Sequence, residues 1–402
     1  MRHSVIRAVV AALSILLVPA GAAVSQDLPE LALDLAQTTV SGLSSGAFMA
    51  VQMHVAFSEH IAGAGVVAGG PYFCAQGSLL LALKDCMETD PAGPDVAPLL
   101  ADAGHYAASG EIDPLTGLVS DRVYLFSGTN DHTVAPPSVD AARRFYIQAG
   151  VAEADIRLVT DVPAGHGFLA PGGPVPCAET GPPFINDCGE DQAGDILTWL
   201  YGDLDPPVSP DPSRLMEFSQ LPFVGNAGVE SLDGMGYVYV PETCAAGETC
   251  RLHIAFHGCQ QGRQQIGDLY ARTTGYNGWA EANHIVVLYP QAIASSGVEN
   301  PKGCWDWWGY GDDDYATRNG PQMAAVALMA SRLGAPLTSM PDGATCISHE
   351  EFNWVHWEQN RAEDCGFFDL CAKGSGDNVG TIWGASTLYE TRPDYYTLTP
   401  CR

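Results

Sequence analysis

The pentapeptide GLSSG at residues 42–46 constrains the fold of this 402-residue chain more than any other feature. A β-like run, Thr38–Val40, precedes the pentapeptide, and residues 47–57 after it have helical spacing. In a G-x-S-x-G sequence between a strand and a helix, the serine occupies a strained turn, and the glycines let the backbone bend without steric conflict. The pattern occurs once and predicts that Ser44 is a nucleophile; the alternative is a glycine-rich turn with an inert serine.

Short β-like runs alternate with helix-like segments along most of the chain. The β-like runs are 64–68, 123–126, 156–159, 237–240, 252–256 and 285–289. Helical spacing is present at 138–149 and 321–333. Such alternation is typical of parallel βαβ units. We therefore expect an α/β fold, with a mostly parallel sheet and helices on both faces.

The stretch 201–212 contains four prolines among aspartates, a composition typical of a surface crossing or a linker. We expect one catalytic domain over residues 26–336 with a joint near 201–212, followed by a small cysteine- and aromatic-rich appendage, 337–402. The aromatic side chains of the appendage could adsorb to a polymer surface. Packing as the core of a stapled unit is favoured, because so small a domain needs such packing. These residues are Trp354, Trp357, Trp383, Tyr395 and Tyr396.

The first 25 residues indicate a secretory signal peptide. Basic residues precede the apolar run Ala8–Val18, which ends in the small residues of Ala20–Ala23. The alternative, a membrane anchor, is disfavoured because the run is shorter than the roughly 20 apolar residues that a spanning helix needs. We therefore expect a secreted protein, extracellular or periplasmic.

Twelve cysteines in an exported chain indicate disulfides. A zinc site is disfavoured because tight C-x-x-C pairs with spaced histidines do not occur in the sequence. The acidic run Asp312–Asp314 lacks the spaced ligands of a calcium loop, so we interpret it as a solvated turn and expect no metal and no cofactor. Three pairs are close enough to close local loops: Cys74 with Cys86, Cys177 with Cys188, and Cys244 with Cys250.

The formal net charge of −29 limits the partners that this chain can bind. So acidic a surface argues against nucleic acid and against anionic membranes. The acidic residues are scattered along the sequence, which favours a solvated surface over a binding site for a cation.

A nucleophilic serine needs a general base, and the base needs an acid that orients it. In α/β-hydrolases these residues follow in the order serine, acid, histidine, each after a strand. Asp131 follows the β-like run 123–126, and His166 follows the run 156–159 between two glycines. His132 is the nearest rival base, but a side chain adjacent to Asp131 points elsewhere. We predict a Ser44, Asp131, His166 triad.

An oxyanion hole takes one backbone N–H from the residue after the nucleophile, here Ser45. The second N–H comes from a loop after an earlier strand, but too few residues precede Ser44 to form such strands. The strand-like run 252–256 instead leads into the tripeptide HGC, which makes Cys259 the second candidate. A circular permutation explains this order, because the opening half of the fold then follows the second half.

These residues carry a family resemblance over roughly 36–335. GLSSGAFMA at 42–50, then Asp131 and His166, and the late HGC at 257–259 resemble the single-domain, circularly permuted extracellular poly(3-hydroxybutyrate) depolymerases. The resemblance implies a Ser-His-Asp triad, an oxyanion hole at the Ser45 and Cys259 amides, and metal-free hydrolysis of a water-insoluble polyester or its oligomers. It also implies export, and we expect a monomer. Residues beyond about 336 exceed the minimal pattern of that family.

The segment CWDWWGYG at residues 304–311 contains three tryptophans within four positions, which predicts a loop. Aromatic rings in a crevice bind an apolar polyester chain through buried area, and an indole N–H can hold an ester carbonyl. We predict substrate binding by Trp305, Trp307 and Trp308, with core packing as the alternative. A disulfide between Cys259 and Cys304 is a further hypothesis. Such a bond would join this loop to the strand-like run 252–256, which leads into the predicted oxyanion residue.

Three functions remain open at this point. The first is hydrolysis of poly(3-hydroxybutyrate)-type polyester to short hydroxyacid oligomers or monomers through an acyl-enzyme. The second is a feruloyl or acetyl esterase that acts on plant cell-wall polysaccharide. The third belongs to another class, a non-catalytic polymer-binding protein that keeps a hydrolase shell.

Overall fold

The computed structural model describes residues 27–88, 92–224, 231–295, 300–337, 347–359, 361–366, 369–373, 377–392 and 395–397. The predicted signal peptide, 1–25, lies outside these residues. Among the described helices, none combines the length and the apolar character that crossing a bilayer requires.

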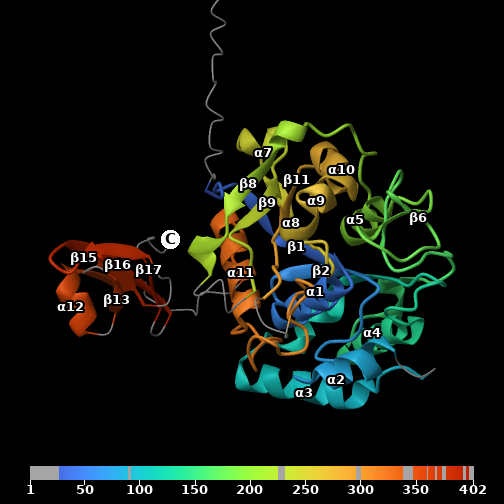
Figure 1. Cartoon of the computed structure of the whole chain (residues 1–402), viewed down its shortest axis with the longest axis horizontal. Helices are drawn as coiled ribbons and strands as arrows, with labels where there is room; N and C mark the ends of the chain where they lie inside the picture. The colour runs from blue at the N-terminus through green and yellow to red at the C-terminus, as the bar shows by residue number, and fades with distance from the viewer. Residues whose placement is uncertain are drawn as a thin grey trace, which may run out of the picture.

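An eight-stranded sheet forms the centre of the protein, with the strand order β4-β3-β2-β1-β10-β11-β9-β8 (Figure 1). The strands from β4 to β11 are parallel to one another, whereas β9 runs antiparallel to β11 and β8 antiparallel to β9. The predicted mostly parallel sheet is therefore confirmed. The strands are β1 (Leu33–Leu43), β2 (Ile61–Val67), β3 (Arg122–Phe126), β4 (Ile156–Val159), β8 (Leu215–Ser219), β9 (Met235–Tyr239), β10 (Cys250–Phe256) and β11 (Ile285–Tyr289).

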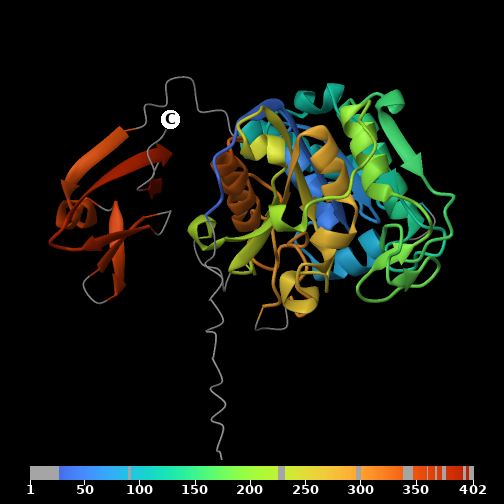
Figure 2. The ribbon, with the colours of Figure 1, turned by 90° about the horizontal axis from the view of Figure 1, so that it is seen from above.

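Helices cover both faces of the sheet (Figure 2). The helices α5 and α10 contact each other, α5 over β1 to β3 and α10 over β11. The helices α1 and α4 pack against β1 to β3 as well, and both contact a short 3₁₀ segment, η2 (Leu115–Ser120). The longer helices are α1 (Ser45–Ala56), α3 (Val96–Ser109), α4 (Pro136–Ala149), α5 (Gln192–Tyr201), α10 (Tyr276–Asn283) and α11 (Pro321–Leu333).

Shorter elements complete the α/β body. The first cysteine loop carries α2 (Leu79–Leu81) and η1 (Ala82–Met87), and a small three-stranded sheet lies in the loop after β4. Its strands are β5 (Phe168–Leu169), β6 (Val175–Pro176) and β7 (Ile185–Asp187). The remaining short helices are α7 (Glu242–Ala245), α8 (Arg263–Ile266) and α9 (Leu269–Thr273).

The strand order shows the circular permutation directly. The first strand, β1, pairs in parallel with β10, so that Val40 lies opposite Ile254 in the centre of the sheet. The chain passes from β4 at one edge through α5 and the irregular residues 202–211 to β8 at the opposite edge. The two ends of the α/β body also meet, because Leu31 N donates to Leu333 O at 3.0 Å. The fold is a circularly permuted α/β-hydrolase.

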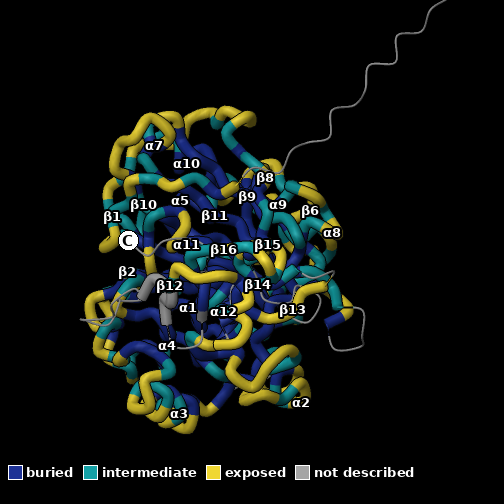
Figure 3. The backbone as a smooth tube through the Cα atoms, turned by 90° about the vertical axis from the view of Figure 1, so that its left-hand side faces the viewer, coloured by how far each residue is buried: buried dark blue, intermediate teal, exposed yellow. Residues whose placement is uncertain are grey.

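One apolar core extends over residues 28–337. The central strands β10 and β11 are buried along most of their length, and exposed backbone lies in the outer helices and loops (Figure 3). The edge strand β8 was not predicted from the sequence. Only two of its five residues are buried, so its apolar pattern is weaker than that of the central strands.

The C-terminal residues form a small β-rich unit with a core of its own. Its apolar cluster includes Leu370, Leu388 and Tyr396. The interpretation that the aromatic residues form this core is confirmed for Tyr396 but wrong for the three tryptophans. Trp354, Trp357 and Trp383 are 45%, 54% and 81% exposed. The elements are β12 (Ile347–Phe352), α12 (Asn353–Glu358), β13 (Ala362–Gly366), β14 (Asp369–Ala372), β15 (Asn378–Thr381), β16 (Ala385–Arg392) and β17 (Tyr395–Thr397).

Five disulfides join cysteines among the described residues. Four of them match the pairs considered from the sequence, and the fifth joins Cys365 to Cys371 in the C-terminal unit. Disulfides of this number indicate an oxidising compartment. The four are Cys74–Cys86, Cys177–Cys188, Cys244–Cys250 and Cys259–Cys304.

Candidate active site

Ser44 occupies a sharp turn between β1 and α1. Its backbone has φ 57° and ψ −121°, a left-handed conformation that non-glycine residues rarely adopt. Main-chain bonds hold the turn on both sides: Ser44 N donates to Val67 O at 2.9 Å, and Ser44 O accepts from Phe48 N at 3.0 Å. This strained turn places Ser44, which is 9% exposed, at the end of a central strand, as is typical of a nucleophile in this fold.

The two glycines of the pentapeptide are required by close backbone approaches. A Cβ on Gly42 would lie 2.2 Å from the carbonyl oxygen of Gly46, inside the same turn. A Cβ on Gly46 would lie 2.4 Å from the carbonyl oxygen of His257, at the end of β10. The first glycine therefore permits the turn, and the second lets α1 pack against the end of β10.

Asp131 and His166 form a buried pair in the loops after β3 and β4. Asp131 Oδ2 accepts from His166 Nδ1 at 2.8 Å, and the two residues are 2% and 5% exposed. Asp131 Oδ1 accepts from the backbone amides of Thr133 and Val134 at 2.8 and 3.0 Å. The carboxylate is thus fixed by three donors, and since Nδ1 donates to it, Nε2 of the imidazole remains as the acceptor.

The loop that carries His166 is fixed independently of Asp131. The backbone N–H of His166 donates to Thr180 Oγ1 at 2.8 Å, and its ring meets Phe184 edge-on with centroids 6.2 Å apart. The disulfide Cys177–Cys188 closes the same loop. The rival base His132 is exposed to solvent.

No hydrogen bond joins Ser44 Oγ to His166 among the described residues. The two residues nevertheless lie at the same end of the sheet, where the parallel strands β1, β3 and β4 have their carboxyl termini, because each residue follows its strand. In proteins without bound substrate, the bond between nucleophile and base is often long and tightens in the complex. The structure therefore supplies an assembled Asp–His pair and a separately positioned serine.

A second buried His–Asp pair lies on the far end of α1. His54 Nε2 is 3.0 Å from Asp121 Oδ2, and His54 Nδ1 is 3.0 Å from the hydroxyl of Tyr146. His54 is ten residues after Ser44 along the same helix, which corresponds to about 15 Å at the α-helical rise. This pair has both ring nitrogens bonded and is separated from the nucleophile.

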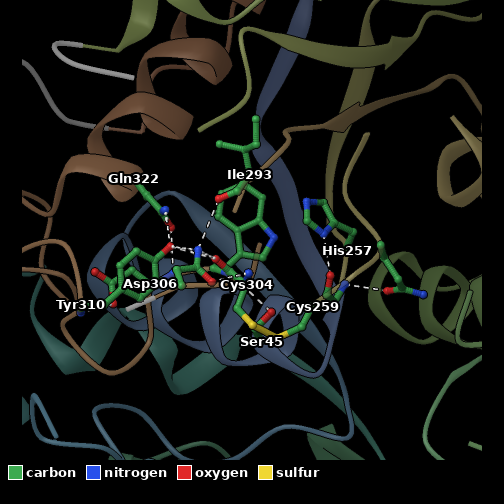
Figure 4. The surroundings of a disulfide bond; sticks show 12 residues. Ser45, His257, Cys259, Ile293, Cys304, Asp306, Tyr310 and Gln322 are labelled. Carbon is green, nitrogen blue, oxygen red and sulfur yellow. Dashed lines mark hydrogen bonds between the residues drawn. A yellow bond between two sulfur atoms is a disulfide. The ribbon is translucent and has the colours of Figure 1, made fainter. Parts of the chain in front are cut away.

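The loop after β10, which carries Cys259, lies directly against Ser44. A Cβ on Gly258 would be 3.4 Å from Ser44 Cβ and 3.2 Å from Leu43 O. The disulfide Cys259–Cys304 joins this loop to the aromatic segment, and Trp305 N donates to Ser45 Oγ at 3.3 Å (Figure 4). Ser45 is the first residue of α1, where backbone N–H groups lack intrahelical acceptors. Both predicted oxyanion residues therefore flank Ser44.

The aromatic segment is an irregular loop, but its tryptophans are largely buried. Trp305 is fully buried and meets Phe256 edge-on at 5.0 Å. Trp307 and Trp308 are 5% and 8% exposed and contact each other edge-on at 5.6 Å. Substrate binding by these three residues stays a prediction, and for Trp305 the packing is that of a core residue.

Asp306 organises the aromatic loop, a role that its sequence position did not reveal. Its Oδ1 accepts from the amides of Gly309 and Tyr310, and its Oδ2 accepts from Gly311, at 2.8 to 3.0 Å. Burial raises the pKa of this carboxyl to about 6, and the backbone hydrogen bonds oppose that rise. A buried aspartate that accepts several amides is a loop-forming residue.

Metal chemistry has no visible ligand set in the part of the chain that the structure describes. No group of three or more His, Cys, Asp or Glu side chains there could hold a metal ion.

Together, the strained serine, the Asp–His pair and the permuted sheet define a serine hydrolase with the α/β-hydrolase fold. No protein-family profile matches the chain. It is 43% identical over 323 residues to the poly(3-hydroxybutyrate) depolymerase of Delftia acidovorans, covering 79% of this chain and 64% of that protein. It is 35% identical over 316 residues to the polyhydroxybutyrate depolymerase of Talaromyces funiculosus, covering 74% of this chain and 90% of that protein.

Two solved structures agree with this assignment. The crystal structure of the PHB depolymerase from Penicillium funiculosum superimposes with a TM-score of 0.70 at 33% identity, covering 77% of this chain and 98% of that one. A serine-to-alanine variant of a PHB depolymerase complexed with an R3HB trimer gives a TM-score of 0.71 with the same identity and coverage. The chain belongs to the poly(3-hydroxybutyrate) depolymerase family.

Proposed function

We propose that this protein hydrolyses poly(3-hydroxybutyrate)-type polyester through an acyl-enzyme on Ser44. The observation that carries the proposal is the strained Ser44 turn, which lies at the same carboxyl-terminal end of the parallel strands as the buried Asp131–His166 pair. Within that pair, Asp131 Oδ2 and His166 Nδ1 are 2.8 Å apart. Family membership supports the polyester as substrate, since relatives named for that activity share 43% and 35% of their aligned residues with this chain.

The proposed reaction has two acyl-transfer steps. His166 Nε2 takes the proton of Ser44 Oγ as the oxygen attacks the ester carbonyl, and the amides of Ser45 and Cys259 stabilise the oxyanion. Protonated His166 then gives its proton to the departing alkoxide oxygen of the polymer, which leaves as a hydroxyl. Water, activated by the same imidazole, releases the acyl group, while Asp131 holds the ring and stabilises its charged form.

We further propose that the aromatic loop forms part of the binding surface for the polyester chain. Trp307 and Trp308 retain 5% and 8% exposure, whereas Trp305 is fully buried. The loop is bonded to Ser45 and to Cys259, both beside the nucleophile. A substrate chain that binds against this loop would therefore have an ester group close to Ser44.

The proposal extends to location and domain organisation. Secretion after removal of residues 1–25 agrees with the five disulfides. A catalytic domain over 26–336 and an appendage over 337–402 agree with the two separate apolar cores, and we propose that the protein acts as a monomer. The chain covers 64% of the length of the Delftia relative. The activity named for that longer protein is therefore assigned to this chain only as a proposal.

The decisive test is a clearing assay on suspended polyester granules with the wild-type and Ser44→Ala proteins. We expect wild-type protein to clear the granules, and Ser44→Ala to keep its circular dichroism spectrum while losing at least about 10³-fold activity. Faster hydrolysis of methyl ferulate than of the granules would favour a plant cell-wall esterase. Failure of wild-type protein to react with a serine-directed phosphonate would instead favour a non-catalytic polymer-binding protein.

A further inference from the structure

His257 is fully buried at the end of β10, and both of its ring nitrogens bond to the main chain. Nε2 lies 3.0 Å from the backbone nitrogen of Ala292, and because an amide nitrogen only donates, Nε2 must be the acceptor. Nδ1 therefore carries the proton and donates to the carbonyl oxygen of Gly258 at 2.7 Å. Burial lowers the pKa of this imidazole to about 4, which keeps it neutral in this tautomer.

The bond to Gly258 fixes the orientation of one particular peptide group. The Gly258 carbonyl and the Cys259 N–H belong to the same planar trans peptide, so they point in opposite directions. Holding the carbonyl toward the His257 ring turns the Cys259 N–H away from it. That N–H donates no hydrogen bond within the described residues, whereas the neighbouring Gln260 N donates to Lys302 O at 2.8 Å.

The Gly258 carbonyl also accepts from the backbone N–H of Gln261, at the longer distance of 3.2 Å. Two further contacts hold the same loop without touching this carbonyl. Gly258 N donates to Gln261 Oε1 at 2.6 Å, and the disulfide fixes the Cys259 side chain against Cys304. His257 and Cys259 lie on one side of this disulfide in Figure 4, and Asp306 and Tyr310 on the other. The imidazole is the side-chain group that grips the Gly258 carbonyl, at the position where Gly258 meets Ser44.

We propose that His257 is a positioning residue that aims the Cys259 N–H at the oxyanion formed on Ser44. This inference rests on the proposed function, and His257 itself touches neither the substrate nor the reacting atoms. Full burial and two committed nitrogens separate it from the general base His166. Through Ala292 the ring also joins the loop after β10 to the loop after β11, so its donor is anchored at both ends.

The test compares His257→Asn with His257→Gln. The Asn amide reaches the position of Nδ1 and keeps a donor for the Gly258 carbonyl, whereas the Gln amide reaches the position of Nε2 and keeps an acceptor for Ala292 N. If His257 had only a structural role, the two variants would differ in stability but would have the same kcat at equal folded fraction. A positioning histidine requires that Asn retain more of kcat than Gln at equal folded fraction.

The measurements are kcat and KM for a soluble p-nitrophenyl butyrate and the affinity for an alkylboronic acid, which forms a tetrahedral adduct on the serine. For His257→Gln and His257→Phe we expect kcat to fall by about 10² with KM within about 3-fold, because one oxyanion donor is misaligned. Affinity for the boronic acid should fall in parallel. In His257→Asn both losses should be about 10-fold or less.

His253→Phe is the matched control. His253 lies on β10, four residues before His257, is fully buried, and has a pKa that burial lowers to about 3, but it bonds to side chains of β1. We expect it to lose stability while keeping kcat within about 3-fold. Wild-type hydrolysis and its loss in Ser44→Ala establish the proposed function first. A folded His257→Gln protein with wild-type kcat, or equal kcat in the Asn and Gln variants, then overturns the positioning role alone.

Discussion

Trp307 stacks face to face on Phe48, with ring centroids 3.9 Å apart and planes 9° from parallel. Phe48 lies in the first turns of α1, four residues after Ser44, so the aromatic loop is joined to the helix that follows the nucleophile. The hydrogen bond from Trp305 N to Ser45 Oγ and the Cys259–Cys304 disulfide add two more connections between the same parts. The aromatic loop, the Ser44 turn and the loop after β10 therefore form one packed assembly.

The stack predicts a specific effect of removing the Trp307 ring. Trp307→Ala should raise KM for a hydroxybutyrate trimer by about 10-fold, because the substrate loses an aromatic contact of roughly 1–2 kcal/mol. The kcat for p-nitrophenyl acetate, which is too short to span the loop, should stay within about 3-fold. Steady-state kinetics on both esters measure the difference. Trp383→Ala, at 81% exposure in the C-terminal unit, is the control for a lost surface indole.

An equal loss of kcat on both esters would contradict this prediction. It would show that Trp307 supports α1 through Phe48 instead of contacting the polyester.

The Cys259–Cys304 disulfide should affect catalysis as well as stability. It closes a loop with a sequence separation of 45 residues, which corresponds to about 4 kcal/mol in the chain-entropy account. The double variant Cys259→Ala, Cys304→Ala should unfold at lower urea and lose about 10-fold in kcat, because the oxyanion amide belongs to Cys259. Urea titrations followed by tryptophan fluorescence, with kcat on a soluble ester, measure both effects.

The matched control is Cys365→Ala with Cys371→Ala, which removes a disulfide of sequence separation 6 from the C-terminal unit. We expect no change in kcat there. If the two double variants lost kcat equally, the link between the disulfide and the oxyanion amide would be wrong.

Asp306 should make stability fall as pH rises through the acid range. Its pKa is raised to about 6 in the folded protein by burial, against 3.8 as the ordinary value, so the folded state binds the proton more tightly. Below pH 3.8 both states are protonated, and above about pH 6 the folded state carries the full penalty of a buried charge. The penalty is about 3 kcal/mol at 1.4 kcal/mol per pKa unit.

Asp306→Asn should remove this dependence. The amide keeps one oxygen for the Gly309 and Tyr310 amides but turns an NH₂ group toward Gly311 N. Urea unfolding at pH 4, 5, 6 and 7 measures the slope in both proteins. An unchanged slope in the variant would assign the pH dependence to other groups.

Much of the site could be predicted because its signals are local or follow chain order. The Ser44 turn is encoded by its own glycines, and the order of Asp131 and His166 after their strands placed them at one edge. The amides that fix Asp131 and the burial of Asp306 depend on loop closure, which leaves no periodic pattern. The exposed tryptophans of the C-terminal unit were misassigned because composition reports aromatic content and not the direction in which a ring points.

His253 should make stability fall as pH drops, which is the opposite sign to Asp306. Tyr201 donates to Leu252 O at 2.9 Å and so accepts from Thr39 Oγ1 at 2.7 Å, which leaves Thr39 to accept from His253 Nδ1 at 2.7 Å. Nε2 then accepts from Ser41 Oγ, also at 2.7 Å. The two hydroxyls of β1 thus hold a neutral tautomer inside the sheet. A second ring proton would require Ser41 Oγ to turn its own proton to the Tyr276 hydroxyl, 2.6 Å away.

Burial lowers the pKa of His253 to about 3 from the ordinary 6.5, so the unfolded state binds the proton first. The stabilisation is complete above pH 6.5 and is lost progressively as pH falls toward 3, at about 1.4 kcal/mol per pH unit. His257, with a pKa of about 4, adds a slope of the same sign. His253→Phe should therefore lower stability at pH 7 by about 1–3 kcal/mol through the two hydroxyls that lose the imidazole, yet reduce the loss of stability on acidification by about 1.4 kcal/mol per pH unit.

Urea unfolding of wild-type and His253→Phe proteins between pH 7 and pH 4 measures this difference. The exposed His105 provides the control, since His105→Phe should leave both the stability and the slope unchanged. A His253→Phe protein as acid-sensitive as the wild type would show that His253 stays unprotonated in both states or is protonated without loss of the fold. His253 would then not be a group that sets the lower pH limit of the folded protein.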